Sequence, residues 1–148
     1  MTRLTSTTLI QSGVKNIVDE LRSNLDSANF TNGSVYSFAS FPKKPAVFPL
    51  VVTRPPEVNT RVSSFGNDSK TAELDFEIHV YAKNAKTVDL IGDDVIDNLT
   101  TDSVVQEFSK DNSMHYQGYR VGDQSKIDYG GFHVYDKTIN VNYEYWGT

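Results

Sequence analysis

The chain has 148 residues, a formal net charge of −5 and no cysteine. This length fits one domain with a core of its own and leaves no room for two ordinary domains. The absence of cysteine excludes disulfides, zinc–thiolate sites and thiol nucleophiles, and the acidic balance gives no basic footprint for nucleic-acid binding. No apolar run approaches the roughly 20 residues that span a bilayer, and residues 1–13 lack the apolar core of a signal peptide. We therefore expect a single domain over residues 1–148, used in the cytoplasm, with no membrane partner.

The first predicted element is an amphipathic helix. Apolar side chains recur at spacings of three and four residues, which places them on one helix face; they are Ile10, Val14, Ile17, Val18, Leu21 and Leu25. Gly13 inside this pattern costs about 1 kcal/mol relative to alanine. The helix is therefore expected to begin near Ser12.

Two short strands and a long polar segment follow the helix. Residues 34–41 and 46–53 are predicted strands, and Pro49 places the second at a sheet edge or starts the strand after itself. Residues 55–69 begin with two prolines and are polar, and segments this long in a compact domain are often functional. We expect either a long loop or an extended hairpin there.

The clearest strand runs from Thr71 to Ala82, because apolar and polar residues alternate along it. One face must be buried, and the other is acidic, with Glu73, Asp75 and Glu77. A helix capped by Asn84 or Thr87 is predicted next. Its apolar stripe consists of Val88, Ile91, Val95 and Leu99, and a further short turn is expected around Val104, Val105 and Phe108.

The last third of the sequence predicts two strands, at residues 113–121 and about 132–145, joined by a turn-rich stretch. Phe132 and Val134 have the opposite parity to Ile139 and Val141, which predicts a bulge near Asp136. The order of helix, strands, helix and strands predicts an α+β fold. We expect a mostly antiparallel sheet with two main helices packed on one face.

Aromatic residues crowd this last third, and few basic residues accompany them. Stacking on single-stranded nucleic acid requires aromatic and basic side chains together, so that function is disfavoured. Core packing and a protein interface, which favours Tyr and Trp, remain the two main interpretations. The aromatic residues are Tyr116, Tyr119, Tyr129, Phe132, Tyr135, Tyr143, Tyr145 and Trp146.

Catalytic motifs are missing from the sequence: it has no Gly-rich phosphate loop, no G-x-S-x-G elbow and no H-E-x-x-H. The best candidate site is the row Asp75, Glu77 and His79, which would hold a divalent metal if a loop added a ligand. A solvated or interface strand face is the favoured interpretation of this row. Together with His115 and His133, His79 would form a metal triad only if three strands aligned. We therefore expect no enzymatic activity, no metal and no cofactor.

The order of elements resembles that of a known protein family. An N-terminal amphipathic helix precedes FPLVVTRP, a long loop, the alternating strand AELDFEIHVYAK, the helix TVDLIGDDVIDNL and a closing β region. This layout, from about residue 9 to residue 145, resembles the tail-terminator and head–tail joining (tail-completion) proteins of long-tailed viruses. The junction between strand and helix at residues 80–90 carries most of the resemblance.

The resemblance implies a structural virion protein, assembled in the host cytoplasm, that forms a homo-hexameric ring at the head–tail junction. Such a ring terminates the tail tube and contacts the tail tube protein and the head-connector or adaptor protein. DNA passes through without sequence-specific binding. The segment 55–69 would reach a neighbouring ring, with Arg54, Glu57, Arg61 and Phe65 at the interface, whereas Glu73, Asp75 and Glu77 would form an acidic channel wall or interface.

Two other functions stay open from the sequence. One is another small virion part, such as a neck adaptor or tail-tube subunit, which would form a different ring or an open polymer. The other is a small monomeric enzyme or ligand-binding domain, which would show a polar pocket and, with metal, the row of Asp75, Glu77 and His79. The oligomeric state and metal dependence distinguish the three.

Overall fold

A computed structural model describes Leu4 and residues 8–42, 46–62, 70–129 and 132–147. For residues 60–62, 70, 129, 132 and 147 it describes the backbone alone.

A six-stranded sheet forms the centre of the molecule, with the strand order β1-β2-β4-β6-β5 and with β3 paired to the first half of β4. All neighbours are antiparallel except β1 and β2, which are parallel. The strands are β1 (Ser37–Phe38), β2 (Leu50–Thr53), β3 (Glu57–Val62), β4 (Lys70–Ala82), β5 (Met114–Tyr129) and β6 (Phe132–Gly147).

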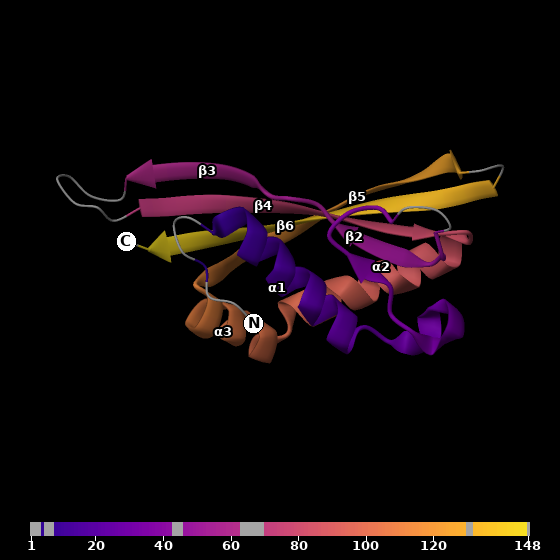
Figure 1. The fold of residues 1–148 in the computed structure, drawn as a ribbon, viewed down its shortest axis with the longest axis horizontal. Coiled ribbons are helices and arrows are strands. Elements are labelled where there is room, and N and C mark those ends of the chain that lie inside the picture. The colour runs from indigo at the N-terminus through magenta and orange to yellow at the C-terminus, as the bar shows by residue number, and fades with distance from the viewer. Residues whose placement is uncertain (1–3, 5–7, 43–45, 63–69, 130–131, 148) are drawn as a thin grey trace.

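Three helices cover one face of this sheet, as Figure 1 shows. They are α1 (Leu9–Asn24), α2 (Ala85–Thr100) and α3 (Asp102–Asn112), and two short 3₁₀ turns, Ser27–Asn29 and Thr31–Gly33, follow α1. The predicted α+β class is confirmed. The short turn expected around residues 104–108 is instead a full helix, α3.

The main core lies between the helices and β4. Leu74, Phe76, Ile78 and Val80 alternate along this strand and are completely buried, as the sequence pattern predicts. Burying one such side chain stabilises the fold by about 1.5–3 kcal/mol. Apolar side chains of all three helices close this core; they include Ile17, Leu21, Val88, Ile91, Val95, Leu99 and Phe108.

The start of α1 differs from the prediction. The helix begins at Leu9 rather than near Ser12, and Leu9 is buried whereas Ile10 is 51% exposed. Gly13 lies within the helix, at a position where a Cβ would come within 2.8 Å of Cζ of Phe76. The glycine therefore serves a close approach of α1 to the sheet and does not mark a helix start.

The strands between α1 and β4 are shorter than predicted. Only β1 forms within residues 34–41, and within residues 46–53 strand pairing begins at Leu50, directly after Pro49. The second alternative for Pro49 is therefore confirmed. Of the two alternatives for residues 55–69, the extended hairpin is confirmed where the structure describes it, since β3 pairs with β4 from Glu57 to Val62. Residues 63–69 lie outside the described part.

The prediction of a bulge near Asp136 is wrong. Strand β6 pairs with β4 without interruption from Tyr135 to Gly147, and the register shifts lie in β5 instead. Val134 does not alternate in step with Ile139 and Val141 for another reason. Its side chain faces the side of the sheet away from the helices and packs in a second small cluster. This cluster consists of Leu50, Val52, Tyr81 and Val134.

The prediction of a turn-rich stretch after Val121 is also wrong for the residues up to Tyr129, because β5 continues through them. The register shift between Val121 and Gln124 accommodates its glycine and aspartate, residues that alone favour a turn.

Candidate functional site

No described helix covers the other face of the sheet (Figure 1). This face carries a concentration of carboxylates. Strand alternation and register place them together on this side. Glu57 lies directly opposite Asp75, and Glu73 lies directly opposite Glu144. We call this surface the acidic face; it consists of Glu57, Glu73, Asp75, Glu77, Asp136 and Glu144.

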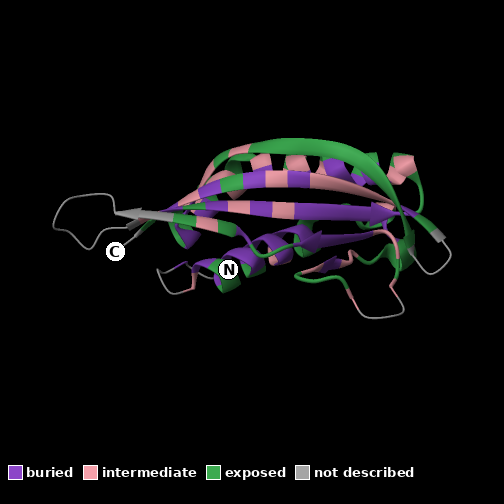
Figure 2. Ribbon diagram, turned by 90° about the horizontal axis from the view of Figure 1, so that it is seen from above, coloured by how far each residue is buried: buried purple, intermediate pink, exposed green. Residues whose placement is uncertain are grey.

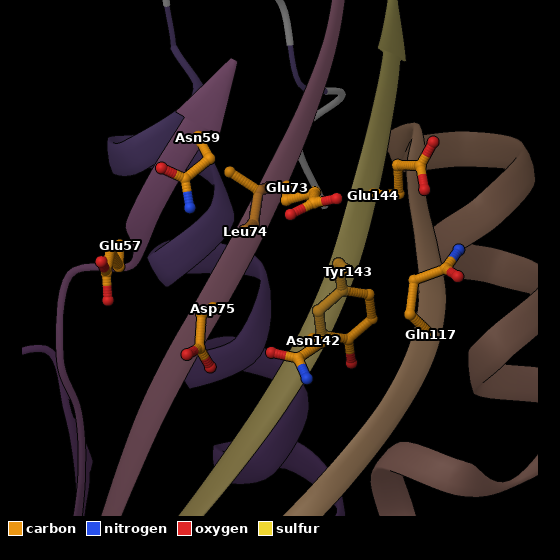
Figure 3. Close-up of a pocket in the computed structure, with 9 residues that line it drawn as sticks. All are labelled: Glu57, Asn59, Glu73, Leu74, Asp75, Gln117, Asn142, Tyr143 and Glu144. Carbon is orange, nitrogen blue, oxygen red and sulfur yellow. The ribbon is translucent and has the colours of Figure 1, made fainter. Parts of the chain in front are cut away.

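A pocket of about 360 Å³ opens on the acidic face, as Figure 3 shows. Four strands contribute to its lining, which consists of Glu57, Asn59, Glu73, Leu74, Asp75, Gln117, Asn142, Tyr143 and Glu144. Oδ1 of Asp75 is buried and has no hydrogen-bond partner in the structure. Like charges directly opposite each other in a sheet are destabilising. The acidic face is therefore unfavourable for the isolated fold, which is typical of a surface kept for function.

His79 lies between two carboxylates of the acidic face. Its Nδ1 is 3.0 Å from Oδ1 of Asp136 and its Nε2 contacts Oε1 of Glu77, while its ring stacks on Tyr81. The hydrogen bond to Asp136, opposed by burial, raises the pKa of His79, and the charge of Asp136 and the Glu77 contact add to this effect. The imidazolium form therefore offsets part of the negative charge around it.

The row of Asp75, Glu77 and His79 is only partly brought together. Glu77 and His79 touch, but the other ring nitrogen of His79 faces Asp136 and not Asp75. Within the described residues, no group of three or more His, Asp or Glu side chains is placed to hold a metal ion.

The three histidines have separate partners. His79 lies with Asp136, whereas Nδ1 of His115 is 2.7 Å from Oγ of Ser109 and its ring stacks on Trp146. Exposed His133 pairs with Asp128 at 2.8 Å. Their surroundings are those of scattered strand histidines.

Of the four residues expected at an interface with a neighbouring ring, Arg54 lies in the β2–β3 connection, and Glu57 and Arg61 lie in β3. Arg54 is exposed, and its backbone N–H donates to the carbonyl of Glu77 at 2.9 Å. Glu57 lines the pocket. Arg61 belongs to β3 by its backbone, but its side chain and all of Phe65 lie outside the described residues.

Several residues of the site were missed from the sequence. Gln117, Asn142 and Glu144 line the pocket, and Asp136 holds His79. In β6, polar Asn140, Asn142 and Glu144 alternate with apolar Ile139, Val141 and Tyr143. This alternation indicates a second half-buried strand with a polar face, but only the register of β4 and β6 shows that the two polar faces coincide.

No protein-family model matches the chain, and no curated protein matches it. Among solved structures, it is similar to a chain in the virion of a native gene transfer agent (GTA) particle, with a TM-score of 0.57. The two are 16% identical, and the match covers 95% of this chain and 99% of that one. At this identity the likeness shows a shared fold over nearly the whole length of both. In the described part of the chain, no helix is long and apolar enough to cross a membrane.

Proposed function

We propose that this chain is a structural virion protein that acts by assembly and not by catalysis. The observation that carries the proposal is the shared fold, over nearly the full length of both chains, with a component of a gene transfer agent virion. Its specific role is that of a ring subunit which terminates the tail tube and joins it to the head connector. Six copies form the ring, in the virion at the head–tail junction, after assembly in the host cytoplasm.

The two faces of the sheet support this role. One face is covered by helices, whereas the other carries the acidic face together with the small apolar cluster around Val134. In a ring with the helices outside, the acidic face lines the channel. Negative side chains repel the phosphate backbone of DNA, so DNA passes through without being held. The ring contacts the tail tube protein on one side and the head-connector or adaptor protein on the other.

Size-exclusion chromatography with light scattering, followed by negative-stain images of the peak, tests this proposal. A closed ring of six copies with a central hole is expected. A ring of another size, or an open polymer, favours a neck adaptor or tail-tube subunit instead. A protein that stays monomeric at every concentration and loses a measurable activity on treatment with EDTA contradicts assembly as its function.

A further inference from the structure

The sheet has two long edges that no other described strand pairs. One is the outer edge of β3, whose inner edge pairs with β4. The other is the outer edge of β5, which pairs with β6 on its inner side. An unpaired edge presents a row of backbone N–H and C=O groups that can pair with another chain. The two edges bound the sheet at opposite ends of the strand order β3-β4-β6-β5, so a second copy can extend the sheet at either edge.

Strand directions allow the sheet to continue from one copy into the next. From β3 through β4 and β6 to β5, every neighbouring pair is antiparallel, so β3 and β5 run in opposite directions. When a second copy in the same orientation is placed beside the first, its β3 lies antiparallel to β5. A contact between two different edges is heterologous, and repeated by rotation it closes a ring.

One stretch of the β5 edge is suited to pairing. Between its two register shifts, β5 pairs regularly with β6 from Gly118 to Val121. Tyr119 is 49% exposed and Val121 is 41% exposed on the helix side of the sheet. Figure 2 shows this strand exposed along most of its length. Bulges and charges protect sheet edges, but this stretch is regular and carries two uncovered apolar side chains.

Strand β3 complements this stretch on both faces of the sheet, namely the face covered by the helices (the helix side) and the face away from them (the open side). On the helix side it carries Val58, which packs at the border of the main core. On the open side it carries Glu57 and Asn59. Strand β5 places Arg120 on the open side, exposed and opposite Asn140 of β6. Apolar residues of both strands thus share one side, and opposite charges share the other.

We propose that β5 of one copy pairs antiparallel with β3 of the next copy, with Val121 opposite Val58 and Arg120 opposite Asn59. In this register Arg120 lies diagonally from Glu57, within reach for two long side chains. Within one copy, Val58 lies across the sheet from the start of β5. Pairing Val58 with Val121 of the neighbouring copy therefore shifts the two copies relative to each other along the strand direction. Closing a sheet into a barrel requires such a stagger. The inference rests on the proposed ring and names the contact that builds it.

Cysteine cross-linking tests this pairing, because the chain has no cysteine of its own. The variants V58C and V121C are made singly and together and treated with a short thiol–thiol cross-linker. A mixture of the two single variants is expected to give a covalent dimer, and neither alone does. The double variant gives a ladder of covalent oligomers up to the full ring. Exposed Asp93 of α2 supplies a matched control, because D93C mixed with V58C is expected to give no product.

Charge exchange supplies a second readout. R120E and E57R, each alone, are expected to raise the protein concentration needed for ring formation at least tenfold. Mixing the two variants is expected to restore rings of alternating copies, because every interface then joins side chains of opposite charge. The double variant R120E/E57R restores the pair at every interface and is expected to recover assembly. Dimers of V121C alone show that β5 pairs with β5 and overturn the proposal. Rings that form without any link between positions 58 and 121 also overturn it but leave the proposed function standing, whereas a chain that never assembles contradicts both.

Discussion

Gly13 is the residue at which helix propensity and packing oppose each other most directly. In G13A the added Cβ would lie 2.8 Å from Cζ of Phe76, a fully buried ring that also packs edge-on against Tyr143. Alanine gains about 1 kcal/mol of helix propensity, but overpacking a tight core costs about 1–3 kcal/mol. We expect a net loss of up to about 2 kcal/mol in the free energy of unfolding, measured in urea.

Gly92 of α2 is the matched control for this prediction. Its nearest neighbours to an added Cβ are Cδ of Lys137 at 3.7 Å and Cδ1 of Ile139 at 3.8 Å, which are ordinary contacts. G92A should therefore raise the free energy of unfolding by up to about 1 kcal/mol. Equal stabilisation by both substitutions would show that Phe76 does not require a glycine at position 13.

His79 makes the stability of the fold depend on pH. The hydrogen bond to Asp136 raises the pKa of His79 above its ordinary value of 6.5, so the folded state binds the proton more tightly than the unfolded chain does. This stabilisation is complete below pH 6.5 and is lost as the pH rises through the folded-state pKa. We expect the wild type to lose stability across this window and D136N to lose less. Urea unfolding at several pH values, with the His79 ring titrated by NMR, measures both effects; an unchanged slope in D136N would contradict the assignment.

At the scale of single elements, Asn84 decides where α2 begins. Its side-chain oxygen accepts the backbone N–H of Lys86 at 2.8 Å, which satisfies a donor that the helix leaves unpaired. Asn84→Ala is expected to lower the free energy of unfolding by about 1 kcal/mol. Asn84→Asp keeps the accepting oxygen and is expected to keep most of the stability. An equal loss in both variants, measured by urea unfolding, would rule out the cap as the cause.

The elements that could be predicted from the sequence are those whose side chains repeat with one period. In β4 every second residue is buried, and in α2 the apolar stripe falls on one helix face, so local pattern and tertiary packing agree. The start of α1 could not be predicted, because the close approach of Gly13 to Phe76 is a tertiary contact. Strand β5 was underestimated for a similar reason: its pairing with β6 overrides the preference of Gly122 and Asp123 for a turn.

The candidate site shows the same limit. The acidic side of β4 was evident from alternation, and Glu73, Asp75 and Glu77 lie on the acidic face as expected. What the sequence could not show is the register that sets Glu144 opposite Glu73 and Asp136 beside His79. Sites assembled across strands depend on pairings between distant residues, and a single sequence contains no direct signal for them.

At the scale of the whole molecule, the position of the acidic face on the side of the sheet away from the helices predicts how an assembled ring treats DNA. The wild-type protein is expected not to bind duplex DNA, because the acidic face repels phosphates. The double variant E73K/E144K reverses charge on that face at side chains that are exposed or partly exposed and lie outside the proposed contact between copies. Its rings should bind a short duplex at least about tenfold more tightly than wild-type rings at 0.1 M salt, a difference of about 1.4 kcal/mol. The apparent affinity should fall steeply with salt, as counterion release requires.

A control variant with the same change in net charge tests whether DNA binding depends on where the new lysines lie and not only on how many there are. The control variant D93K/D97K places the same charge change on exposed positions of α2, on the other side of the sheet. Because only the channel surrounds a duplex on all sides, low-dielectric walls concentrate the field there. The control should therefore bind DNA more weakly than the acidic-face variant, as measured by fluorescence anisotropy on rings checked by light scattering. Equal binding by the two variants would mean that the acidic face does not line a channel through which DNA passes.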